Sequence, residues 1–205
     1  GDYSSIQDAL SSSSPGDTIV VEGGTYNEGS VSNDYGTILY IPHAVTLIGA
    51  DVDAVIVQSD IPGEAQRTTA IAFGADAEQD TRITGMTFVH TQPGTSGDIR
   101  SYSAVSDDGN GVATGTIKMD HVIFRLTEDH AKCMLHSMDE VDKIFENVVM
   151  DFGNTNKGLM TYVGTLSSES EIFNSIVYNT NGNSVFQGVD EEGPQITTNY
   201  SLFYG

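Results

Sequence analysis

The feature of this 205-residue chain that most constrains its fold is a repeat. Five segments share a polar residue or a glycine, with an isoleucine two or three positions before it and a large apolar residue three positions after it. These pivot residues are Gly85, Asp120, Asn147, Asn174 and Asn199, which subtraction places 35, 27, 27 and 25 residues apart. Such a period is typical of solenoids, in which each repeat buries its apolar face only by stacking on its neighbours.

Each repeat has the same internal order of strand, acidic turn, strand, pivot and strand. The pivot predicts a sharp bend between two strands, because Asn, Asp and Gly tolerate left-handed backbone angles. Asn174 is expected to stack between Asn147 and Asn199, where asparagines can hydrogen-bond along the ladder. A β-sandwich, the competing interpretation, would show hairpin turns but not this fixed order.

The first stretch, "DYSSIQDALSSSSPGDTIVV", predicts a helix and then a strand. Ser4 and Gln7 have the spacing of a capping box, in which their side chains satisfy free N–H groups. Ile6, Ala9 and Leu10 lie at helical spacing on one face. This helix is expected to lie across an open sheet end and to cover its apolar side chains and unpaired backbone groups.

Three N-terminal motifs, "DYSSIQDAL", "SPGDTIVVEGGTY" and "IPHAVTLIGAD", join the pivot repeats in pointing to a family. On these motifs the chain resembles the right-handed parallel β-helix proteins of the pectin-lyase-like group. The resemblance implies an all-β, right-handed, single-stranded parallel β-helix solenoid with a short N-terminal capping helix. The length of the chain predicts one domain over residues 1–205, with the cap helix and turn in 1–16 and the coils in 17–205. That group includes lyases, polygalacturonases, epimerases, tailspikes and secreted surface proteins, so the fold leaves the function open.

The charge of the chain excludes some partners. Its 29 Asp and Glu against 8 Lys and Arg give a net charge of -21. Nucleic acids and anionic membrane surfaces need a basic face, so neither is expected as a partner. No apolar run approaches the roughly 18 residues of a membrane helix, and no membrane insertion is expected. A chain that begins "GDYSSIQ" fits what remains after a signal peptide is removed, which predicts an extracellular or cell-surface location.

Acidic residues gather in the turns after the leading strands of the repeats. Five such turns hold 13 of the 29 acids: Asp76, Glu78, Asp80, Asp107, Asp108, Asp139, Glu140, Asp142, Glu169, Glu171, Asp190, Glu191 and Glu192. Stacked repeats would align them in a stripe, where like charges repel by about 1 kcal/mol per pair even in a water-like dielectric. Ca²⁺, which favours several oxygen ligands, would offset this repulsion, and all of these residues except Glu169 and Glu171 are candidate metal ligands. The alternative is a solvated acidic edge that blocks sideways sheet pairing.

The catalytic patterns of the resembling enzymes are incomplete here. Pectate lyases use an arginine base beside Ca²⁺, and the candidate here is Arg125, near Glu128 and Asp129. A solvated position, with the aliphatic part of the arginine lying along the sheet surface, explains Arg125 equally well. Polygalacturonases carry an Asp pair, which Asp107-Asp108 matches, but their Gly-His-Gly is missing and "TIK" only approximates Arg-Ile-Lys. The histidines lie at unrelated phases of the repeat, so solvated or core positions are expected rather than a zinc site: His43, His90, His121, His130 and His136.

Two further residues have alternative interpretations. Cys133 is the only cysteine, so it forms no internal disulfide and is either a buried small hydrophobe or an intermolecular cross-link. Asn199 begins a glycosylation sequon, but it coincides with a pivot and a structural role is expected.

Two functions remain open from the sequence. The first is a non-enzymatic extracellular protein that self-associates into a sheath, surface layer or filament. The chain stops at "NYSLFYG", within an expected strand, so another subunit would cover that end unless the chain is a fragment. The second is a Ca²⁺-dependent polysaccharide lyase or carbohydrate-binding protein with aromatic platforms at Tyr162, Tyr178, Phe186 and Tyr200.

Overall fold

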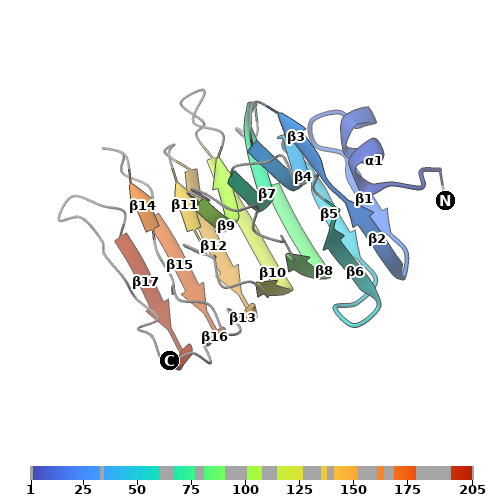
Figure 1. Ribbon diagram of the computed structural model, residues 1–205. Helices are drawn as coiled ribbons and strands as arrows, with labels where there is room; N and C mark the ends of the chain where they lie inside the picture. Colours follow the sequence, from blue (N-terminus) through green and yellow to red (C-terminus); the bar gives the residue numbers. More distant parts are fainter. Residues whose placement is uncertain are drawn as a thin grey trace, which may run out of the picture.

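The fold is all-β with one short helix (Figure 1). The computed structural model describes residues 2–32, 35–60, 67–76, 81–90, 101–107, 115–126, 135–137, 141–151, 161–163, 169–178 and 195–204. Within these ranges the strands form two sheets, and all described pairs are parallel except β3 with β4. The predicted all-β class and parallel pairing are confirmed, and the arrangement is consistent with a solenoid.

From β1 to β15 the chain passes repeatedly from one sheet to the other, and the last four strands all belong to the larger sheet. The helix α1 spans Ile6–Ser12. The larger sheet contains β1 (Thr18–Val21), β2 (Gly24–Glu28), β5 (Thr46–Gly49), β6 (Val55–Ser59), β8 (Thr81–His90), β10 (Gly115–Leu126), β12 (Val141–Glu146), β13 (Val149–Asp151), β15 (Glu169–Phe173), β16 (Ile176–Tyr178), β17 (Gln195–Asn199) and β18 (Leu202–Tyr204). The smaller sheet contains β3 (Ser30–Ser32), β4 (Tyr35–His43), β7 (Arg67–Asp76), β9 (Ser101–Asp107), β11 (Leu135–Ser137) and β14 (Thr161–Val163).

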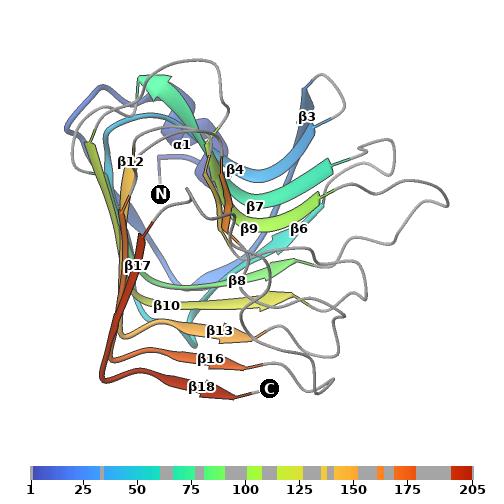
Figure 2. The same ribbon diagram turned by 90° about the vertical axis from the view of Figure 1, so that its left-hand side faces the viewer.

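The larger sheet has two limbs that meet at a sharp corner (Figure 2). The first limb runs in the order β1-β5-β8-β10-β12-β15-β17. The second limb runs in the order β2-β6-β8-β10-β13-β16-β18. Both β8 and β10 pass through the corner without interruption and belong to both limbs.

The corner is built by one residue per repeat with left-handed backbone angles. These bend residues are Gly85 (φ 72°), His121 (φ 53°), Asn147 (φ 56°), Asn174 (φ 46°) and Tyr200 (φ 51°). The strand register continues from each to the next. Their spacing is 36, 26, 27 and 26 residues by subtraction, which is more regular over the last three steps than the predicted spacing.

Two of the five predicted pivots were therefore wrong by one residue. Asp120 is paired in the ladder between Thr84 and Glu146, so the bend falls on His121. Asn199 ends β17, and the bend falls on Tyr200. Asn174 stacks on Asn147 as expected, but its other neighbour is Tyr200 instead of Asn199. Backbone bonds cross the bends, from Asn147 N to the Phe173 carbonyl (3.1 Å) and from Asn174 N to the Asn199 carbonyl (3.1 Å).

Serines directly after the last two bends also link repeats. The Ser175 hydroxyl accepts a bond from Val148 N (3.1 Å) and donates to the Phe173 carbonyl (2.6 Å). One repeat later, the Ser201 hydroxyl accepts a bond from Ser175 N (3.2 Å). Each of these hydroxyls satisfies a backbone N–H of the preceding repeat at the point where the strand is interrupted.

The core consists of apolar side chains that face inward from both limbs and from the smaller sheet, which contributes Leu39, Ile41, Ile71 and Phe73. In the first limb, Ile83, Met119, Phe145 and Ile172 follow one another in register and are fully buried. In the second limb, the corresponding buried column is Phe88, Phe124, Met150 and Val177. The rings of Phe88 and Phe124 stack with centroids 5.4 Å apart. Each such side chain stabilises the fold by about 1.5–3 kcal/mol through burial, but only if the neighbouring repeat is present.

The helix α1 covers the edge of β4, as the sequence predicts. The helix residues Ile6, Ala9 and Leu10 are buried on its inner face. The side-chain amide of Gln7 donates to the Tyr40 carbonyl (3.0 Å) and accepts from Tyr40 N (2.8 Å), so it replaces a neighbouring strand at that residue.

The predicted capping box is wrong, because Gln7 is used on β4 instead. The N-cap is Ser5, whose hydroxyl accepts a bond from Asp8 N (3.2 Å). The buried carboxylate of Glu28 accepts bonds from Ile6 N (2.6 Å) and from the Ser5 hydroxyl (3.0 Å). Glu28 of β2 therefore accepts a hydrogen bond from a backbone N–H group at the helix N-terminus that has no partner within the helix. No helix in the described part of the chain is long and apolar enough to cross a membrane.

Candidate functional site on the outer face of the larger sheet

The outer face of the first limb carries two columns of side chains. The first column holds the residues three positions before the bends: Arg82, Lys118, Ile144 and Glu171. The second column holds the residues one position before the bends: Thr84, Asp120, Glu146 and Phe173. Side chains alternate across a strand, so both columns point away from the core.

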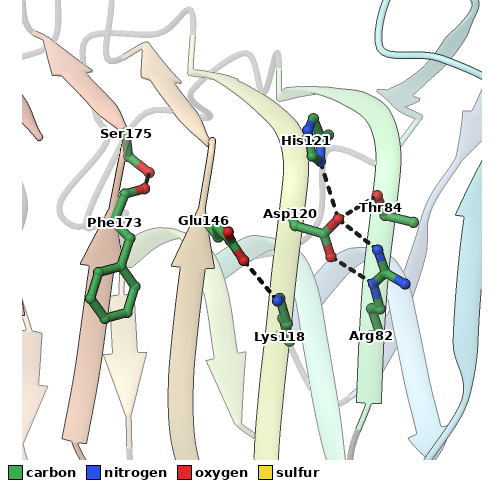
Figure 3. Close-up of polar contacts among 8 residues, drawn as sticks. All are labelled: Arg82, Thr84, Lys118, Asp120, His121, Glu146, Phe173 and Ser175. Atoms are coloured by element: carbon green, nitrogen blue, oxygen red, sulfur yellow. Dashed lines mark hydrogen bonds and ion pairs between the residues drawn. The ribbon is translucent and has the colours of Figure 1, made fainter. Parts of the chain in front are cut away.

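Ion pairs cross diagonally between these two columns (Figure 3). Arg82 of β8 binds Asp120 of β10, and Lys118 of β10 binds Glu146 of β12 at 2.7 Å. In each case the base pairs with an acid one repeat later and two positions nearer the bend. The next positions on this diagonal are Ile144 and Phe173, which are both apolar and half-buried.

Asp120 is the centre of the polar cluster. Its side chain is only 5% exposed and accepts two bonds from the Arg82 guanidinium, from Nε at 2.6 Å and from Nη2 at 2.8 Å. The Thr84 hydroxyl donates to the same carboxylate at 2.9 Å. Burial acts to raise the pKa of Asp120, but the bonds from Arg82, His121 and Thr84 together outweigh it and hold that pKa well below its usual range. The carboxylate is therefore ionised under all ordinary conditions.

His121 lies beside this carboxylate at the bend. Its Nδ1 is 3.2 Å from Asp120 Oδ2, and its side chain is 65% exposed. Nδ1 faces Asp120, so Nε2 is the ring nitrogen left for other contacts. Arg82, Lys118, Asp120 and Glu146 carry two positive and two negative charges, so these four side chains form a neutral cluster.

The outer face of the second limb is more apolar. An aliphatic column runs through four consecutive strands and consists of Ile123, Val149, Ile176 and Leu202. Ile176 is 43% exposed and Leu202 is 60% exposed. These two side chains are large apolar groups on a solvent-facing sheet surface.

A polar column lies two residues further along the same strands. Arg125, Asp151 and Tyr178 are neighbours in register. Burial, together with a hydrogen bond to Asp151 and its charge, raises the pKa of Tyr178 to about 12, although the Arg125 charge acts in the opposite direction. Tyr178 is therefore a neutral hydrogen-bonding partner of Asp151 at neutral pH.

The predicted metal stripe falls largely outside the described residues. Glu78, Asp80, Asp108, Asp139, Glu140, Asp190, Glu191 and Glu192 lie there, and their role as ligands stays a prediction. Asp76 and Asp107 end the adjacent strands β7 and β9. Asp107 of β9 pairs with Phe73 of β7. Asp76 follows Phe73 by three residues, so it lies about 10 Å beyond Asp107 along the strand direction.

Like Asp76 and Asp107, three further acids expected in turns lie in strands instead. Asp142 is in β12, and Glu169 and Glu171 are in β15, because these strands begin before the predicted turns end. When the register of β12 with β15 is extended by one residue, Asp142 is the neighbour of Glu169, and their backbones lie about 4.8 Å apart. Among the described residues, no group of three or more His, Cys, Asp or Glu side chains is arranged to hold a metal ion.

The other predicted site residues have mixed outcomes. Arg125 is exposed and neighbours Asp151, whereas its expected partners Glu128 and Asp129 lie outside the described residues. His43 Nε2 lies 3.0 Å from the Ser13 hydroxyl at the end of α1. The following predictions fall on residues or side chains outside the described part of the chain: His90, His130, Cys133, His136, Tyr162 and Phe186.

The sequence alone did not predict that Arg82, Lys118 and Glu146 belong to one cluster. A signal was present, however, once the repeats are aligned on the true bends. Arg82 and Lys118 both lie three positions before a bend, and Asp120 and Glu146 both lie one position before a bend. The shift of one residue at Asp120 obscured this pattern.

Comparisons of the chain with protein-family models, with curated proteins and with solved structures found no match in any of the three.

Proposed function

We propose that the chain is a right-handed, single-stranded parallel β-helix with a structural role outside the cell or at the cell surface. Its copies associate into a sheath, a surface layer or a filament. The observation that supports self-association is the aliphatic column of the second limb, where Ile176 and Leu202 remain 43% and 60% exposed on a sheet face. Contiguous exposed apolar side chains on a sheet mark an interaction surface.

The polar cluster of the first limb suits a scaffold better than a catalyst. A general acid or base works best when its pKa lies near the working pH. The pKa of Asp120 lies well below that range, and both of its carboxylate oxygens are bonded to neighbouring side chains. Arg82 is committed to the same contact, so the cluster joins two repeats of the sheet.

The net charge sets the conditions under which copies associate. At -21, two copies repel each other unless salt or bound cations screen the charge. Ca²⁺ at the acidic turns would lower this repulsion, and Asp76 and Asp107 lie at the carboxyl ends of neighbouring strands.

Electron microscopy and sedimentation velocity of the concentrated protein test the proposal. Both are run at low salt, at high salt and with Ca²⁺. Regular polymers or discrete oligomers that increase with salt or Ca²⁺ are expected. Monomers under every one of these conditions would overturn the structural role.

The alternative is a polysaccharide-binding protein or a Ca²⁺-dependent polysaccharide lyase. It is favoured by the corner of the larger sheet, where Tyr200 is 93% exposed and is stacked in register after Asn147 and Asn174. An aromatic ring beside amide groups offers both stacking and hydrogen-bonding contacts. Incubation with acidic polysaccharides distinguishes the two functions, because a lyase yields an unsaturated product that absorbs in the ultraviolet.

A further inference from the structure

The self-association proposed above leaves the interface and its symmetry open. We propose that the outer face of the second limb packs against the same face of a second copy about a two-fold axis. The axis runs parallel to the strands, midway between β10 and β13. Arg125 of each copy then faces Asp151 of the partner subunit. This inference rests on the proposed function and specifies the surface that carries it.

The first support is the apolar character of this face from β10 to β18, where the aliphatic column is unbroken. Its first outer column, which includes the aliphatic column, is Thr25, Ile56, Thr87, Ile123, Val149, Ile176 and Leu202. A sheet with one apolar outer face is stabilised when that face packs on another sheet, at a spacing of about 10 Å.

The second support is the charge of the face. Its second outer column is Asn27, Gln58, Val89, Arg125, Asp151 and Tyr178. The two columns together hold one positive residue, Arg125, and one negative residue, Asp151. This face therefore has no net charge in a chain of net charge -21, so two copies can meet here without direct repulsion.

The third support is the geometry of the proposed axis. A two-fold axis along the strands reverses the order of the repeats but keeps each position along the strand, so every column faces itself. With the axis between β10 and β13, Ile123 faces Val149 of the partner subunit. The same operation brings Arg125 opposite Asp151 of the partner subunit twice, once in each direction. No other placement along the column brings these two opposite charges face to face.

Two positions that the proposed axis brings together also differ in exposure. The Thr87 hydroxyl of β8 donates to the Val52 carbonyl (2.7 Å), so the turn that contains Val52 covers Thr87, which is only 1% exposed. Ile176 of β16 is 43% exposed. The axis places the covered Thr87 of one copy opposite the exposed Ile176 of the partner subunit.

Charge reversal tests the pairing without relying on either residue alone. Arg125→Asp and Asp151→Arg are each expected to weaken self-association by about ten-fold or more, because like charges then face each other across the axis. An equal mixture of the two variants is expected to recover association as a heterodimer, since both facing pairs then again join one aspartate to one arginine. Sedimentation velocity and light scattering measure the association, and circular dichroism confirms that each variant is folded.

Further variants separate this inference from the proposed function. Ile176→Lys is expected to weaken association, whereas Thr197→Lys, an exposed position on the first limb, adds the same charge and is expected to leave it unchanged or to strengthen it. If the wild type associates but none of the second-limb variants changes the association, the interface is wrong and the structural role stands. If the wild type and the mixed variants are all monomers in high salt and in Ca²⁺, both proposals are wrong.

Discussion

At the scale of single residues, Asp120 shows how a buried charge is held in a repeat structure. Its carboxylate is bonded by Arg82 and Thr84 of the preceding repeat and lies beside His121 of its own repeat. Burial of an unpaired carboxylate would be costly, but paired with a bidentate guanidinium it joins two adjacent strands. The residue therefore contributes to stability only as long as it is ionised.

Asp120→Asn is expected to destabilise the protein by about 1–3 kcal/mol at neutral pH, a figure reduced from that of a fully buried pair because Arg82 is half-exposed. Because the folded pKa is depressed, the contribution is present above the unfolded pKa of about 4 and is lost as the pH falls through the folded value. Urea unfolding at neutral and acidic pH measures the difference between variant and wild type. That difference should shrink in acid.

The matched control is Glu146→Gln, which removes the exposed Lys118–Glu146 pair on the neighbouring diagonal. Both of its side chains are about 40% exposed, so a loss below about 1 kcal/mol is expected. Equal effects of the two variants would show that the burial of Asp120 does not matter.

Tyr200 occupies a bend position that a tyrosine adopts at a cost. Its φ of 51° disfavours a side chain with a Cβ atom, and the ring is 93% exposed, so little packing offsets the strain. Tyr200→Asn is expected to raise the free energy of unfolding by about 0.5–1 kcal/mol. Asn174→Ala, at the equivalent position of the preceding repeat, should lower it by a similar amount. Thermal melts of both variants measure these changes, and effects of the same sign would contradict the bend assignment.

At the scale of secondary-structure elements, α1 acts as a substitute strand for the edge of β4. Gln7 provides one donor and one acceptor to the backbone of Tyr40, as a neighbouring strand would. Gln7→Ala should leave both groups of Tyr40 without this partner and destabilise the protein by about 1–3 kcal/mol. Hydrogen exchange of the Tyr40 amide is expected to accelerate. Ser11→Ala, on the same helix, is the control and should leave that exchange rate unchanged.

The strands were predictable because each carries its own signal, but the polar contacts between them were not. In β8, for example, the predicted order of strand, pivot and strand around Gly85 is confirmed. The bend at His121 was missed because propensity favours Asp120, whereas the register and the bond to Arg82 decide the outcome. Gln7 was assigned to a local cap because its partner, Tyr40, lies 33 residues away. Residues that act across repeats become predictable only after the register is known.

At the scale of the whole molecule, charge is the dominant property. The net charge of -21 destabilises the compact state through self-repulsion, and salt weakens that term. If the acidic turns bind Ca²⁺, the melting temperature in millimolar Ca²⁺ should exceed that in EDTA at matched ionic strength. NaCl at the same ionic strength is the control for screening. An unchanged melting temperature would contradict the metal site and leave the solvated acidic edge.

The diagonal ion pairs have a mechanical consequence. Arg82 to Asp120 and Lys118 to Glu146 incline in the same sense, each advancing by one strand and by two residues toward the corner, or about 7 Å along the strand. Ion pairs that all incline in the same sense resist the sliding of adjacent strands in one direction. Sliding the later strand toward the corner lengthens both pairs together, while sliding it the other way does not. The part of the sheet from β8 to β12 is therefore stiffer against shear in one direction than in the other.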